Sequence, residues 1–241
     1  MRSLLTYLPL LMSLYAAAAL AAQGELVMLA PVDQAMPIAR IQNGAIAGGI
    51  VKDFGDALAQ RLGRRAVYLS ADSPEVTPAL SSGRADAMCY VMPFWIDGDY
   101  NWSPPLFPDA EMIAARHDMP HLRSLKDLRD KQVGTVTQYR YQRVELVLGT
   151  RFRRVDAPNM EANIQQMLAG KVPYTMISEA TLNYLHRVTP ELKVRADLVF
   201  SAYKAQCAFS QKSAIPFADI SRAIDTLVKD GSVDQILARY R

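Results

Sequence analysis

The segment Tyr90–Asp99, YVMPFWIDGD, carries aromatic and acidic side chains directly after a short apolar run typical of a buried strand. Tyr90, Phe94 and Trp95 offer flat faces that stack on an apolar, aromatic or cationic group. Pro93 ends the strand, so these side chains lie at its carboxyl end. The pattern predicts a wall of a binding site. The alternative is that Tyr90 belongs to the core and that Phe94 and Trp95 pack under a loop.

A second group of polar side chains lies in TVTQYRYQ, residues 135–142, which is predicted to run from a strand into a helix. The first turn of a helix has free backbone N–H groups and the positive end of the helix dipole, which together favour an anion. Arg140 could add a bidentate hydrogen bond to a carboxylate. Gln138 and Tyr139 could donate further hydrogen bonds. Arg140 is otherwise a solvated helix residue.

Two acids complete the candidate ligand-binding set. Glu179 follows a later predicted strand, and Asp33 lies in the loop after the first strand. Glu179 could equally be a favourable acid in the first turn of a helix. The sequence indicates no metal site, since His117 and His121 have no third ligand nearby, and no nucleophile–base set or cofactor motif is present.

The N-terminus indicates export. Residues 1–22 combine a short positive start, an apolar stretch and small residues at the end, which predicts a secretory signal peptide. No Cys follows it at once, so no lipid anchor is expected at the mature end. The mature protein is therefore expected in the periplasm.

The charge balance argues against a nucleic-acid partner or an anionic membrane surface. The chain has 27 Lys and Arg against 24 Asp and Glu, a net charge of +3. The basic cluster Arg151, Arg153 and Arg154 is better explained by a solvated strand face than by a phosphate-binding track.

Strand and helix patterns alternate along the chain, which predicts an α/β fold with parallel pairing. The pattern runs from strand 25–30 to strand 111–116, restarts at 124 and continues to about 186. The later strand 206–210 and its two helices cannot bury themselves alone, so they must return to the first unit. The prediction is two α/β lobes joined by a two-segment hinge. Residues 23–116 and 206–241 form lobe 1, and residues 117–205 form lobe 2.

Five segments carry a family resemblance: Gly49-Ile50-x-x-Asp53-x-x-x-Ala57-Leu58, ALSSGRADAM (79–88), SLKDLRDKQVGTV (124–136), MLAGKVPYTMISE (167–179) and LVKDGSVDQILARYR (227–241). In this order they resemble family 3 solute-binding proteins of ABC transporters, the polar-amino-acid type. The resemblance implies a type II periplasmic-binding-protein fold whose lobes close over a small solute. It also implies a membrane permease as partner.

The resemblance also implies roles for individual residues. Members of the family grip the ligand's carboxylate with an Arg on lobe 1, but this chain has no Arg or Lys between Arg84 and Arg116. Lobe 1 is therefore expected to stack on the ligand. Lobe 2 is expected to supply charge, with Arg140 facing a carboxylate and Glu179 an ammonium group. Cys89 and Cys207 are expected on neighbouring strands, bonded or not.

The leading function is a monomeric periplasmic solute-binding component of an ABC importer, for an amino-acid-like or carboxylate-bearing solute. One alternative is a periplasmic enzyme resembling cyclohexadienyl dehydratase, with Glu179 as an acid whose pKa is raised by burial. Another is a sensory module that presents its closed form to a separate receptor.

Overall fold

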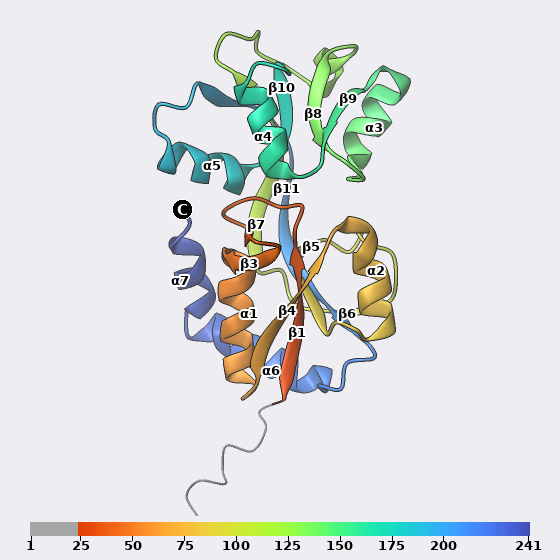
Figure 1. The fold of residues 1–241 in the computed structure, drawn as a ribbon, viewed down its shortest axis with the longest axis vertical. Helices are drawn as coiled ribbons and strands as arrows, with labels where there is room; N and C mark the ends of the chain where they lie inside the picture. Colours follow the sequence, from red (N-terminus) through yellow and green to blue (C-terminus); the bar gives the residue numbers. More distant parts are fainter. Residues whose placement is uncertain (1–23) are drawn as a thin grey trace, which may run out of the picture.

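The computed structural model describes residues 24–241, and the predicted signal peptide, 1–22, lies outside them. Figure 1 shows two lobes, with lobe 1 below and lobe 2 above. Lobe 1 contains β1 (Glu25–Pro31), β2 (Arg40–Gln42), β3 (Ala45–Gly48), α1 (Ile50–Arg61), β4 (Arg65–Ala71), α2 (Ser73–Ser82), β5 (Ala87–Val91), β6 (Tyr100–Trp102), α6 (Phe217–Lys229) and α7 (Ser232–Ala238). Lobe 2 contains the 3₁₀ helices η1 (Leu125–Leu128) and η2 (Gly149–Arg151) with β8 (Gln132–Val136), α3 (Gln142–Leu148), β9 (Arg153–Ala157), α4 (Met160–Leu168), β10 (Tyr174–Ser178) and α5 (Glu179–Val188).

Two long antiparallel strands connect the lobes: β7 (Phe107–Arg116) and β11 (Val194–Ser210). They pair from Phe107 opposite Ala205 to Arg116 opposite Val194. From Gln206 onward β11 pairs with β5 instead. Except for β2 and β3, which pair only with each other, the strands of both lobes thus form one hydrogen-bonded path in the order β4-β1-β5-β11-β7-β10-β8-β9, with β6 on β11. The strand predicted at 206–210 is longer than expected, because its first half pairs along β7.

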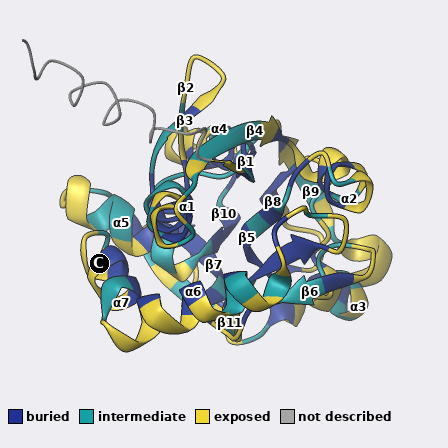
Figure 2. Cartoon of the chain, turned by 90° about the horizontal axis from the view of Figure 1, so that it is seen from below, coloured by how far each residue is buried: buried dark blue, intermediate teal, exposed yellow. Residues whose placement is uncertain are grey.

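Helical periodicity places the core of lobe 1. In α1, the buried positions Ile50, Phe54 and Leu58 recur at intervals of four, which puts them on one face of the helix. The amphipathic helices α6 and α7 both pack against α1. The C-terminal helices are therefore part of the lobe 1 core. Figure 2 shows buried stretches in central strands such as β5 and β7, and helices whose outer faces are exposed.

A disulfide joins the two cysteines of the chain. Cys89 lies in β5 and Cys207 opposite it in β11, both fully buried. The expectation of neighbouring strands is confirmed, and the bond fixes β11 to lobe 1. Within residues 24–241, no helix has the length and apolar character needed to cross a membrane.

Candidate functional site

A cavity of about 530 Å³ lies between the lobes. Its lining follows the carboxyl ends of β1, β4 and β5 in lobe 1 and of β8 and β10 in lobe 2, with further residues on β7 and β11. In open α/β sheets ligands bind outside these strand ends, and the volume suits a small molecule. Both lobes contribute walls, so a molecule held here would touch both.

The structure brings most of the sequence-predicted residues together at this cavity. Phe94 is not part of the lining; the residue is 55% exposed, and its ring stands edge-on to that of Trp95, with 6.0 Å between centroids. Glu179 is also outside the lining; it is the exposed first residue of α5. The predicted residues that do line the cavity are Asp33, Tyr90, Trp95, Gln138, Tyr139 and Arg140.

Asp33 connects three elements at the cavity. Its Oδ2 atom accepts hydrogen bonds from the backbone N–H of Ser73, at 3.2 Å, and from the hydroxyl of Ser73, at 2.7 Å. Its backbone carbonyl accepts from the N–H of Met160 in lobe 2, at 2.9 Å. The neighbouring Gln34 donates to the Tyr139 hydroxyl. Burial raises the pKa of Asp33, and the hydrogen bonds from Ser73 and Tyr139 oppose that shift.

Arg140 lies before a helix rather than in its first turn. The sequence predicted a helix from Gln138, but α3 begins at Gln142, because Gln138 has a left-handed backbone with φ of 67°. The prediction of an anion-binding site in the first turn of that helix is therefore wrong. The Arg140 guanidinium lies 3.4 Å from Asp97 of lobe 1, and both side chains are more than half exposed.

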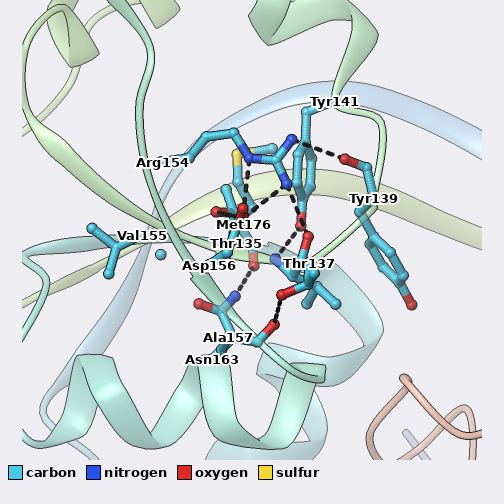
Figure 3. Close-up of polar contacts among 12 residues, drawn as sticks. Thr135, Thr137, Tyr139, Tyr141, Arg154, Val155, Asp156, Ala157, Asn163 and Met176 are labelled. Carbon is cyan, nitrogen blue, oxygen red and sulfur yellow. Dashed lines mark hydrogen bonds and ion pairs between the residues drawn. The ribbon is translucent and has the colours of Figure 1, made fainter.

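Arg154 holds the segment that carries Arg140. Its guanidinium donates to the backbone carbonyls of Val136, at 2.9 Å, and Tyr139, at 3.0 Å, and pairs with Asp156 (Figure 3). It also lies over the ring of Tyr141, 5.2 Å from the centroid. The interpretation of this Arg as part of a solvated face is wrong, because the guanidinium turns inward to the turn after β8.

Asp109, a buried acid on β7, positions two aromatic rings of the cavity. Its Oδ2 accepts from the hydroxyls of Tyr90, at 2.8 Å, and Tyr203, at 3.3 Å. Its Oδ1 accepts from the backbone N–H groups of Ala110 and of Ala180, the latter in the first turn of α5. Burial and the nearby Asp109 carboxylate raise the pKa of both phenols. The same carboxylate therefore holds the lobe 1 wall and contacts lobe 2.

Comparison with known proteins gives structural neighbours only. No family model matches the chain, and no curated protein matches it. An ancestral arginine-binding protein bound to arginine is 22% identical, covers 90% of this chain and 98% of its own, and superposes with a TM-score of 0.77. The amino acid ABC transporter substrate-binding protein AbpA of Streptococcus pneumoniae, bound to L-arginine, is 19% identical, with 90% and 94% covered and a TM-score of 0.72. The ancestral amino-acid-binding protein AncCDT-1, a precursor of cyclohexadienyl dehydratase, is 17% identical, with 90% and 95% covered and a TM-score of 0.72.

The chain has the two-lobed fold of the amino-acid-binding proteins. This confirms the predicted fold class. Because all these identities are below 25%, the likeness establishes the architecture, and the solute has to be argued from the cavity itself.

Two acids at the centre of this binding-protein fold escaped the sequence-based prediction. Asp109 and Glu111 lie two residues apart on β7 and therefore point to the same face of the strand. Glu111 lines the cavity, and burial raises its pKa while the nearby Arg143 opposes the shift. The signal was two acids spaced by two in an otherwise apolar strand, since charged residues are rarely buried without a partner or a function.

Proposed function

We propose that this protein is the periplasmic solute-binding component of an ABC importer. It acts as a monomer that binds a small polar solute between its lobes and delivers it to a membrane permease. The observation that carries the proposal is the cavity of about 530 Å³, which residues of both lobes line at the carboxyl ends of their strands. A solute held there stabilises one arrangement of the lobes over others, which gives a permease a conformation to recognise.

Contacts across the cavity support closure as part of this function. The Asp33 carbonyl meets the N–H of Met160, and Arg140 faces Asp97 at 3.4 Å. All four groups lie beside the cavity, at points where the lobes separate if the hinge strands bend. The solute therefore adds to a small set of interlobe contacts, and the closed form gains stability from binding.

A thermal-shift screen of amines, amino acids and organic acids tests the proposal, because a ligand that binds only the folded state raises its midpoint. Trp95→Ala removes an indole from the cavity, and Trp102→Ala removes one from β6, outside it. We expect the hit to shift wild type and Trp102→Ala and to shift Trp95→Ala less. The proposal fails if no compound class shifts wild type, or if both variants respond like wild type.

Catalysis is the second candidate, because Asp33 and Glu111 line the cavity with pKa values raised by burial, as a general acid requires. The two functions differ in what happens to the bound molecule. Mass spectrometry of the solute after prolonged incubation with the protein separates them. Recovery of unchanged solute supports binding, and catalytic conversion of excess solute supports an enzyme.

A further inference from the structure

Acidic side chains outnumber basic ones in the cavity lining of residues 24–241. Asp33, Asp72, Asp97 and Glu111 line it, and Arg140 is the one Lys or Arg in the lining. Arg140 lies beside Asp97, where both side chains are well exposed and solvent screens their charges. Asp33 and Glu111, the two less exposed acids of the lining, have no basic side chain beside them in the lining, although Arg143, outside it, acts on Glu111. The lining therefore carries more negative than positive charge, which attracts a cation and repels an anion.

Backbone N–H groups at the starts of helices near the cavity, which could otherwise bind a ligand carboxylate, already donate to acceptors of the protein. At the start of α2, the Ser73 N–H donates to Asp33, and Asp72 forms a capping box with Glu75. At the start of α5, the Ala180 N–H donates to Asp109. A carboxylate entering here would compete with internal carboxylates for the same donors, and their charges would repel it.

The same arrangement holds at α4, where the Met160 N–H donates to the Asp33 carbonyl and the Ala162 N–H to the side chain of Asn159. Three helices that begin near the cavity therefore point N–H groups at atoms of the protein. Their positive ends stabilise buried acceptors instead of forming an anion site.

The aromatic lining suits a positive charge. Tyr90, Trp95, Tyr139, Tyr141 and Tyr203 all line the cavity. The hydroxyl protons of Tyr90 and Tyr203 point to Asp109, so their oxygens face other neighbours only as acceptors. The faces of such rings attract ammonium and guanidinium groups, and most strongly where water is excluded.

We infer that the cavity selects an organic cation, an alkylammonium or guanidinium compound, and does not recognise a carboxylate on it. Glu111 provides the counter-charge, since it lies on the hinge strand β7 and forms no ion pair within 4.0 Å in the described part of the chain. Arg143, which is outside the cavity lining, acts on it only from beyond that distance. The inference rests on the proposed function and narrows it. It replaces the sequence-based pairing of Arg140 with a carboxylate and of Glu179 with an ammonium group.

Matched ligand pairs test the inference by calorimetry on the mature protein. Agmatine is L-arginine without its carboxylate, and cadaverine is L-lysine without its carboxylate; choline and glutarate extend the set. We expect at least one carboxylate-free cation to bind, with a dissociation constant no more than about threefold above that of its amino acid where it has one. Glu111→Gln should weaken that binding about tenfold or more, whereas Glu161→Gln, on α4 and outside the cavity, should leave it unchanged.

Other results overturn the inference. An amino acid that binds about tenfold or more tightly than its carboxylate-free partner, and loses that advantage in Arg140→Gln, would show that Arg140 holds a carboxylate. Binding of glutarate but of no carboxylate-free cation would show an anion site. In both cases the proposed solute-binding function survives. If nothing in this set or in the thermal-shift screen binds, the function fails as well.

Discussion

Removing the Cys89–Cys207 disulfide should lower the free energy of unfolding substantially. The bond closes a loop with a sequence separation of 118 residues. The chain-entropy relation gives about 5 kcal/mol at 25 °C for a loop of this length, and removal of native disulfides typically costs about 2–5 kcal/mol. We therefore expect about 3–5 kcal/mol for the double variant Cys89→Ala/Cys207→Ala, which leaves no polar group in the buried site.

Urea unfolding followed by circular dichroism measures this loss. Wild type unfolded in the presence of a reductant serves as control, because it lacks the bond but keeps both side-chain volumes. Reduced wild type and the double variant should agree within about 1 kcal/mol, and both should fall well below oxidised wild type. A double variant as stable as oxidised wild type would refute the reasoning, since loop closure would then contribute nothing.

Four further predictions concern the acids and the arginine around the cavity. Burial raises the pKa of Asp33 and Glu111 above their ordinary values of 3.8 and 4.5. A bound cation should therefore be released as the pH falls through those raised pKa values. Binding of the cation should in turn release protons, which calorimetry in buffers of different ionisation heat detects. In the unliganded protein the same raised pKa values stabilise the fold at low pH, and this contribution is lost as the pH rises through them, which a comparison of wild type with Glu111→Gln in urea at several pH values will show. Asp109→Asn should lower the free energy of unfolding by about 1–3 kcal/mol, because one amide oxygen replaces two acceptors that hold four donors. The control Asp225→Asn, at an exposed position of α6, should change it by less than about 0.5 kcal/mol. Arg154→Ala should weaken cation binding by about tenfold, because Arg154 positions the segment that carries Arg140. Arg154→Lys should restore only part of the lost affinity, since a lysine cannot bridge two carbonyls and a carboxylate at once. Equal affinity in wild type and both variants would contradict this positioning role of Arg154.

The helices and strands that the sequence predicted correctly are those that end at a breaker residue such as glycine or proline. Strand β1, helix α1 and strand β5 have apolar cores and clear breakers, such as Gly63 after α1. The first half of β11 was missed because residues 194–205 are mostly half-buried or exposed and show no continuous apolar run. Its hydrogen bonds come from β7, a partner distant in sequence, and only the three-dimensional pairing reveals them.

The location of the cavity could be predicted from the sequence, but the charge of its lining could be predicted only in part. Tyr90 lies at the carboxyl end of a predicted strand, and Trp95 and Arg140 follow such ends, so the carboxyl-end rule located them. The start of α3 was misplaced because nothing local signals the left-handed backbone of Gln138, which is rare outside glycine. Glu111 entered the site because β7 runs through the hinge, a consequence of the whole fold rather than of a motif.

The fluorescence of Trp95 tests the central claim, that a solute binds between the lobes, most directly. The chain has two tryptophans, of which Trp95 lines the cavity and Trp102 does not. Trp102→Phe therefore leaves one reporter inside the cavity, and Trp95→Phe leaves one outside it. Titration with the cation that binds best should change the emission of Trp102→Phe saturably, with the dissociation constant found by calorimetry, and leave that of Trp95→Phe unchanged. A saturable signal confined to Trp95→Phe, or none in either variant while calorimetry reports binding, would contradict a site between the lobes.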